Sequence, residues 1–167
     1  MEQWTPGYIA RAEMWLFVTT LAYFLMNGAQ IFETAVLVPR WSHTPPESLQ
    51  LLRQIDLKTF WITTHSLHEI TFILAIVFCW KIVPVRNGLA LLFAIHVAVR
   101  VWTLLYFAPA IMAFQANDSF TGESVAGLAD KVNRWRALNY VRIGIFILLS
   151  LGLIPLYYKM IKLRSGL

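Results

Sequence analysis

The sequence predicts an all-α integral membrane protein, an antiparallel four-helix bundle with a polar cavity inside the membrane. Three observations support this class: four long apolar segments, few charged residues, and polar side chains inside every apolar segment. The chain of 167 residues is 58% hydrophobic and 14% charged, whereas soluble domains carry about 25% charged residues. Because one bilayer crossing takes about 20 apolar residues, four crossings use most of the chain, and residues 1–167 are expected to form a single domain.

The predicted crossings are joined by one short connection and two long ones. They cover residues 12–38, 59–82, 88–113 and 137–158. Only residues 83–87 separate the second crossing from the third, which predicts a tight antiparallel hairpin. The first connection, 39–58, includes a helix-like stretch at 47–55, and the third, 114–133, has turn and cap residues at 117–123. Both long connections lie on one side of the membrane, the loop side, because an odd number of crossings precedes each.

The placement of basic residues predicts orientation and partners. The termini and the hairpin carry Arg11, Lys81, Arg86, Lys159, Lys162 and Arg164, and the loop side carries Arg40, Arg53, Lys58, Lys131, Arg134 and Arg136. The positive-inside rule counts Lys and Arg, and this count is a tie. The basic hairpin and C-terminal segment favour cytoplasmic termini in the cell membrane. Since the basic residues lie at helix ends, the net charge of +5 indicates membrane lipids as partners and not nucleic acid.

Every predicted crossing places polar side chains on one helical face, at spacings of three, four or seven residues. A charged side chain at the bilayer centre costs roughly 2.5–3.5 kcal/mol, so such residues usually face the protein interior and mark a functional site. The candidate catalytic residues are His65, Glu69, His96, Arg100 and Arg142. The candidate substrate-binding residues are Asn27, Gln30, Glu33, Trp61, Trp135 and Asn139.

The types of these residues suit proton chemistry. Glu33 and Glu69 balance Arg100 and Arg142, so the interior can be neutral. His65 or His68 beside Glu69 would form a histidine–carboxylate pair suited to proton transfer near neutral pH, and the guanidiniums would stabilise an oxyanion. Paired charges could instead only hold the helices together, but that role does not require three histidines.

The same region could hold a metal ion. The candidate ligands are His65, His68, Glu69, His96 and Glu33. Two histidines and a carboxylate suit iron or another divalent metal. Ferritin-like di-iron bundles, however, use Glu-x-x-His on two helices, and this chain has no such motif. We therefore expect either no cofactor or a single transition metal. Haem is disfavoured, because the arginines suit an anionic or oxygen-bearing ligand better.

Two motifs carry a family resemblance. The first is Gly28-x(3)-Phe32-Glu33-x(5)-Pro39-x-Trp41, and the second is Trp135-x(3)-Asn139-x(2)-Arg142. Together they resemble the anthrone-oxygenase-like family of small four-span membrane proteins. The resemblance implies oxidation of a hydrophobic aromatic compound of the polyketide type, without an added organic cofactor. It also implies roles for Glu33, Trp135, Asn139 and Arg142, which fall on motif positions, whereas the histidines and Glu69 come from the chemistry alone.

Three functions are compatible with these features. The first is a membrane oxidoreductase or oxygenase acting on a lipid-soluble aromatic or quinone-like compound, and the same proton chemistry would also serve an isomerase. The second is a protein that binds or transports a lipophilic ligand or an ion, although a carrier of only four spans without broken helices would need a homo-oligomer. The third is an accessory subunit of a membrane complex, with Gly144 and Gly152 as a helix-contact face.

Overall fold

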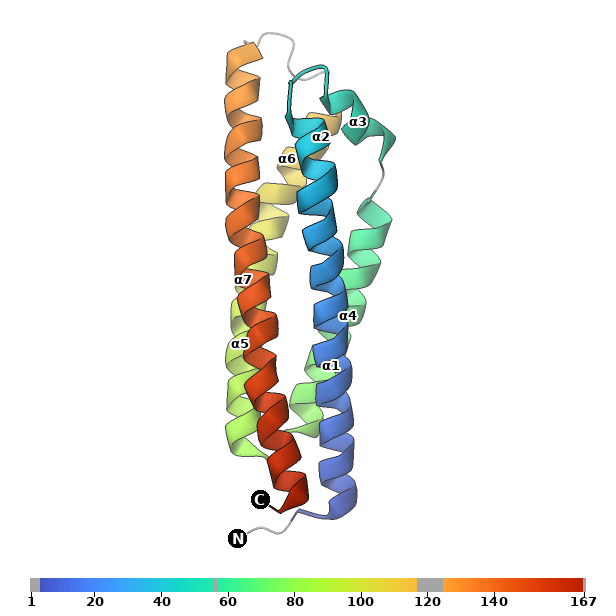
Figure 1. Cartoon of the computed structure of the whole chain (residues 1–167), viewed down its shortest axis with the longest axis vertical. Helices are drawn as coiled ribbons and strands as arrows, with labels where there is room; N and C mark the ends of the chain where they lie inside the picture. The colour runs from blue at the N-terminus through green and yellow to red at the C-terminus, as the bar shows by residue number, and fades with distance from the viewer. Residues whose placement is uncertain (1–3, 56, 117–124, 167) are drawn as a thin grey trace.

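The computed structural model describes residues 4–55, 57–116 and 125–166, and no strand occurs among them. Four helices are long and apolar enough to cross a membrane (Figure 1): Pro6–Ser42, Lys58–Phe78, Val83–Ala116 and Val125–Ser165. The predicted all-α class with four long apolar helices is therefore confirmed, and the length and composition of these helices are those of a multi-pass membrane protein. Both termini lie at the same end of the molecule (Figure 1).

Two of the four long helices contain a π-helical turn. The first consists of α1 (Pro6–Phe32), the π turn η1 (Glu33–Leu37) and α2 (Val38–Ser42). The third consists of α5 (Val83–Trp102), the π turn η2 (Thr103–Phe107) and α6 (Ala108–Ala116). The second and fourth, α4 (Lys58–Phe78) and α7 (Val125–Ser165), are uninterrupted, and α3 (Leu49–Gln54) is the short helix predicted in the first connection.

A proline follows each π turn, although Pro155 inside α7 is accommodated without one. Pro39 lies two residues after η1 and Pro109 two residues after η2. A proline within a helix lacks the N–H for the bond to the carbonyl four residues earlier, and its ring clashes with that carbonyl. The backbone widens instead, so that the N–H of Val38 bonds to the Glu33 carbonyl and the N–H of Ala108 to the Thr103 carbonyl, a five-residue spacing that defines a π turn.

Several predicted boundaries need correction. The first, third and fourth helices extend beyond the predicted crossings, and α4 ends at Phe78 instead of residue 82. Much of the third connection is helical, because α6 continues to Ala116 and α7 begins at Val125. Leu128 and Val132 follow helical periodicity and are buried, which explains this extension. The turn residues predicted at 117–123 lie outside the described residues.

The long helices pack around two separate apolar clusters. α1 contacts α4 and α7, α5 contacts α7 and α4, and α3 packs against α6 and α2 (Figure 1). The cluster nearer the termini contains Leu16, Met26, Phe72, Phe146 and Leu153. The loop-side cluster contains Val38, Trp41, Leu49, Phe107 and Trp135. On the first helix and on α7, candidate polar residues such as Gln30, Glu33 and Asn139 fall between the parts that build these two clusters.

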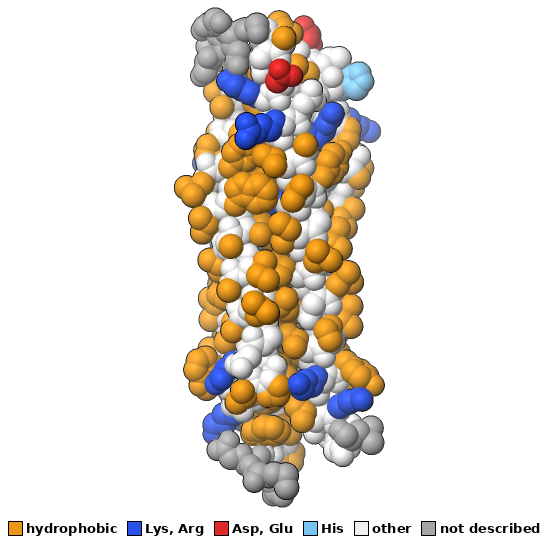
Figure 2. Space-filling view, turned by 90° about the vertical axis from the view of Figure 1, so that its left-hand side faces the viewer, with side chains coloured by type: hydrophobic (Ala, Val, Ile, Leu, Met, Phe, Trp, Pro, Cys, Tyr) orange, Lys and Arg blue, Asp and Glu red, His pale blue; other side chains and the backbone are white. Residues whose placement is uncertain are grey.

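The outer surface has the pattern of a membrane protein. Figure 2 shows Lys and Arg side chains in two bands, one near each end of the molecule, with a mainly hydrophobic belt between them. Large apolar side chains such as Leu25, Leu105 and Leu148 are more than 60% exposed in this belt. Basic side chains near both ends of an apolar belt are expected where helices meet the two lipid headgroup regions.

Near the termini, leucine side chains of α5 and α7 pack over glycines of the opposite helix. A Cβ atom added at Gly152 would lie 2.9 Å from Cδ2 of Leu92, and one added at Gly88 would lie 2.6 Å from Cδ2 of Leu156. On each helix a leucine follows a glycine by four residues, and the leucine of one helix packs over the glycine of the other. Gly144, by contrast, has nothing within 4 Å of such a Cβ. Gly144 and Gly152 were proposed as a face for contact with another protein of a membrane complex, but Gly152 already packs against Leu92 of its own chain.

Gly152→Val should destabilise the protein more than Gly144→Val in the same helix. Both changes alter helix propensity equally, but only Gly152→Val forces Leu92 to move, and overpacking costs roughly 1–3 kcal/mol. Thermal unfolding in detergent would measure this as a lower Tm for Gly152→Val, partly restored by Leu92→Ala. Equal Tm values for the two glycine variants would contradict the interlocked packing.

Candidate functional site

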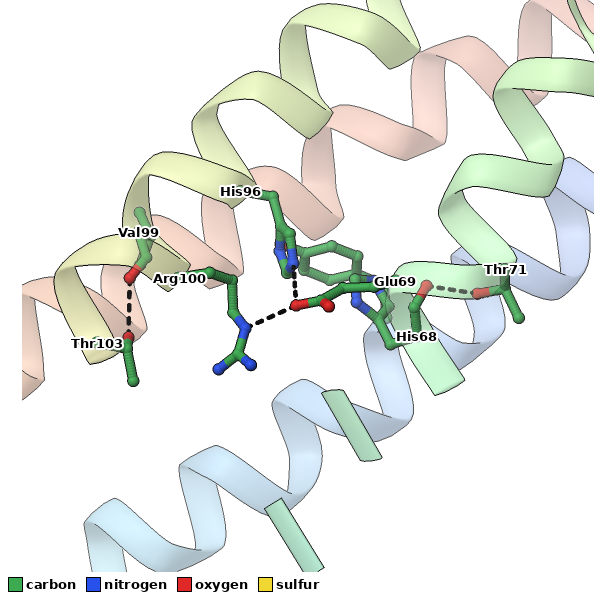
Figure 3. A network of polar contacts seen from close by, with 8 residues as sticks. His68, Glu69, Thr71, His96, Val99, Arg100 and Thr103 are labelled. Carbon is green, nitrogen blue, oxygen red and sulfur yellow. Dashed lines mark hydrogen bonds and ion pairs between the residues drawn. The ribbon is translucent and has the colours of Figure 1, made fainter. Parts of the chain in front are cut away.

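An ionic chain crosses from α1 through α5 to α4 at the middle of the apolar belt. The Tyr23 hydroxyl lies 3.1 Å from Nδ1 of His96, and both side chains are fully buried. On its other side, Nε2 of His96 lies 3.6 Å from Oε1 of Glu69, which is too long for a hydrogen bond and becomes an ion pair only when His96 is protonated. The same carboxylate oxygen accepts a 2.7 Å hydrogen bond from Nε of Arg100 (Figure 3).

The sequence predicted the carboxylate partner incorrectly. Glu69 was expected beside His65 or His68 of its own helix, whereas its contacts are with His96 and Arg100 of α5. Residues four apart on a helix share a face, but a Glu side chain can extend sideways to the neighbouring helix. The histidine–carboxylate pair of this site is therefore His96 with Glu69.

His65 and His68 lie beside this chain and have unused nitrogen atoms. The His68 ring packs edge-on against Tyr23 with centroids 4.2 Å apart, and its centroid lies 4.9 Å from that of His96. It is 1% exposed, and neither ring nitrogen has a hydrogen-bond partner among the described residues. His65 packs against Trp61 and Phe146, and its ring lies within electrostatic range of both Arg100 and Arg142.

The motif Trp135-x(3)-Asn139-x(2)-Arg142 on α7 joins the two π turns. Nδ2 of Asn139 donates a 3.1 Å hydrogen bond to Oγ1 of Thr34 in η1, and Oδ1 of Asn139 accepts a 2.7 Å bond from Arg142. The Arg142 guanidinium lies 4.4 Å from the ring centre of Phe107 in η2. The indole N–H of Trp135 donates to the Phe107 carbonyl at 3.4 Å. One face of α7 thereby fixes the spacing between the first and third helices.

The remaining candidate residues complete a polar layer between the two apolar clusters. The carboxyl of Glu33, in η1, lies near the Arg142 guanidinium and the Trp61 side chain. Asn27 is buried and donates a 3.0 Å hydrogen bond to the Phe146 carbonyl on α7. Gln30 is 2% exposed, and its Oε1 has no partner in the described part of the chain. The polar layer consists of Tyr23, Asn27, Gln30, Glu33, Thr34, Trp61, His65, His68, Glu69, His96, Arg100, Trp135, Asn139 and Arg142.

Buried polar atoms without a partner are concentrated in the polar layer. Seven of the ten such atoms in the described residues are Oδ1 of Asn27, Oε1 of Gln30, Nδ1 of His65, both ring nitrogens of His68, Nε2 of His96 and Nε of Arg142, and the other three belong to Trp4, Glu13 and Ser42. Most buried polar groups in native proteins have a hydrogen-bond partner, and exceptions usually have a functional or solvent explanation. These atoms come from all four long helices. The layer can therefore hydrogen-bond a ligand that carries several oxygen atoms.

Two predictions about this site gain no support from the geometry. The described residues contain no group of three or more His, Cys, Asp or Glu side chains arranged to hold a metal ion, so the five candidate ligands do not form a metal centre in this arrangement. The two hollows that the structure describes lie at the loop-side surface and in a groove between the first helix and α7. A cavity inside the polar layer remains a prediction.

Sequence reasoning missed some participants. Tyr23 and Thr34 continue the helical spacing of Asn27 and Gln30, but only the structure shows their contacts with His96 and Asn139. Phe107 has no polar signal in the sequence, yet it receives both Arg142 and Trp135. The π turns had an available signal, because Pro39 and Pro109 interrupt otherwise helical apolar segments.

Comparison of the chain with protein-family models, with curated proteins and with solved structures finds no match. The resemblance to the anthrone-oxygenase-like family therefore rests on the two sequence motifs alone.

Removing one partner of the Glu69–Arg100 pair should destabilise the protein. A hydrogen bond to a charged group contributes roughly 1.5–3 kcal/mol, and Arg100→Gln leaves the Glu69 carboxylate without its cation. A double-mutant cycle with Glu69→Gln, measured by thermal unfolding, should give strongly non-additive effects, while Arg134→Gln, an exposed control, changes Tm little. Additive effects of the two single changes would show that the pair contributes nothing to stability.

Proposed function

We propose that this chain is a membrane-embedded oxidoreductase of the oxygenase type, acting on a hydrophobic hydroxylated aromatic or quinone-like compound. In this proposal the four helices form an antiparallel bundle in the cell membrane, with cytoplasmic termini and the polar layer as a buried binding cavity. The observation that supports it most is the concentration of unpartnered polar atoms from four helices beside two guanidiniums. A ligand with an apolar ring system and a few oxygen atoms complements such a site.

His65 is the proposed base. Its Nδ1 is without a hydrogen-bond partner among the described residues, and its ring packs against Trp61 and Phe146 inside the layer. A neutral imidazole there would accept a proton from a phenol or from an acidic C–H of the substrate, as histidines do in general base catalysis. The proton moves to His65, and the electron pair remains on the substrate as an oxyanion.

Arg100 and Arg142 would stabilise that oxyanion. Preorganised positive charge in a water-poor site lowers the energy of developing negative charge. Glu69 positions Arg100 through the 2.7 Å hydrogen bond, and Asn139 positions Arg142 through the 2.7 Å bond to its guanidinium. An electron-rich anion of this kind reacts with dioxygen, which connects the proton chemistry to the oxidation implied by the two motifs.

Oxidation of anthrone by dioxygen to anthraquinone, followed by absorbance, tests this proposal. His65→Gln should reduce the turnover rate by about 10²–10⁴-fold, the usual contribution of a general base, while anthrone binding measured by fluorescence quenching is retained. Arg142→Lys should also reduce turnover, because an ammonium lacks the planar donor geometry of guanidinium. Arg134→Lys, an exposed residue outside the layer, is the matched control.

Other outcomes would redirect the assignment. Full turnover in the separate His65→Gln, His68→Gln and His96→Gln variants would exclude histidine base catalysis. Binding that depends on Arg142, with no turnover of anthrone by the unchanged protein, would favour a lipophilic-ligand binding protein. The metal content of the purified protein should also be measured. One equivalent of a transition metal per chain would support the metal-dependent alternative.

A further inference from the structure

A groove on the lipid-facing surface lies next to a hollow at the loop side that has charged side chains in its lining. The groove has a volume of about 390 Å³ and lies between the first helix (Ile31, Ala35 and Pro39) and α7 (Tyr140, Gly144 and Ile147). The hollow has a volume of about 650 Å³ and also includes Pro39, together with Arg40 and Glu47. Pro39 lines both, so the groove and the hollow are neighbours along the first helix.

The groove matches one leaflet of a bilayer in length. From Pro39 to Ile31 the first helix spans eight residues, or about 12 Å at 1.5 Å per residue. Half of a bilayer's hydrocarbon thickness is about 15 Å. The lining is mostly aliphatic, and at Gly144 a Cβ would meet nothing within 4 Å. An extended acyl chain from the adjacent leaflet fits these dimensions.

The hollow carries one charge of each sign. Arg40 and Glu47 are both exposed, and neither forms an ion pair with another described residue. A lipid phosphate would be attracted to the Arg40 guanidinium, while the Glu47 carboxylate attracts an ammonium and repels a purely anionic headgroup. Thr44 and Ser48 also line the hollow and add hydroxyl groups. The combination complements a phosphate joined to a primary ammonium.

We propose that this surface binds a phosphatidylethanolamine molecule, with an acyl chain in the groove and the headgroup between Arg40 and Glu47. The primary ammonium of this headgroup donates hydrogen bonds to Glu47, which the quaternary ammonium of phosphatidylcholine cannot do. Phosphatidylglycerol offers the phosphate but no cation for Glu47. The groove lies on the outer surface and shares Thr34 with the polar layer, but the lipid proposal uses none of the proposed catalytic residues and does not rest on the proposed enzymatic function.

Native mass spectrometry of the purified protein tests the headgroup. The detergent-solubilised protein is mixed with phosphatidylethanolamine, phosphatidylcholine or phosphatidylglycerol of identical acyl chains, and the retained lipid is measured. The proposal expects about tenfold tighter binding of phosphatidylethanolamine, the effect of one charge-assisted hydrogen bond. Glu47→Gln should remove this preference and increase retention of phosphatidylglycerol. Arg40→Gln should weaken the binding of all three lipids. Equal retention of the three lipids, or an order unchanged by Glu47→Gln, would overturn the headgroup assignment.

Two glycine variants test the groove itself. Gly144→Phe fills the groove and should reduce retention of every phospholipid at least about tenfold, because a displaced acyl chain loses several buried CH₂ groups. Gly28→Phe is the matched control, since Gly28 also has nothing within 4 Å of an added Cβ but does not line the groove. Tm values for both variants verify that they fold. Equal lipid retention by two folded variants would rule out the acyl chain site.

Discussion

The contact between Glu69 and Arg100 is the constraint around which the middle of this molecule is arranged. A carboxylate and a guanidinium within an apolar belt are each costly to remove from water, and their mutual attraction compensates only if the geometry is close. The 2.7 Å hydrogen bond meets that condition and fixes α4 against α5. His96 is held on the same carboxylate and Tyr23 on His96, so α1 is aligned by the same chain of contacts.

The polar layer also depends on backbone geometry set by two prolines. Pro39 and Pro109 each come after a π turn, and both turns contact the Asn139–Arg142 segment of α7. A regular helix would present Thr34 and Phe107 at different angles, because a π turn adds a residue and rotates the next part of the helix about its axis. The π turns therefore place Thr34 and Phe107 where α7 can contact them, and these contacts in turn stabilise the π turns.

Much of the architecture can be predicted from the sequence, whereas the pairing of side chains within it cannot. Hydropathy and length identify the four helices, and helical spacing places residues such as His65, His68 and Asn139 on buried faces. Which side chains meet across helices depends on helix rotation and rotamers, so Glu69 was assigned to histidines of its own helix instead of His96. The extension of α7 to Val125 was missed because membrane hydropathy says little about amphipathic helix ends that pack against a loop-side cluster.

The two ends of the molecule are held together by different forces. Near the termini, glycines and leucines of α5 and α7 interdigitate, and such contacts are lost only if the helices separate by a whole side chain. Toward the loops, cohesion depends more on single hydrogen bonds and stacked aromatic rings, which yield to small displacements. The spacing of α7 from its neighbouring helices is therefore limited at one end by the missing side chains of Gly88 and Gly152, and farther along α7 by the length of the Asn139 and Trp135 hydrogen bonds.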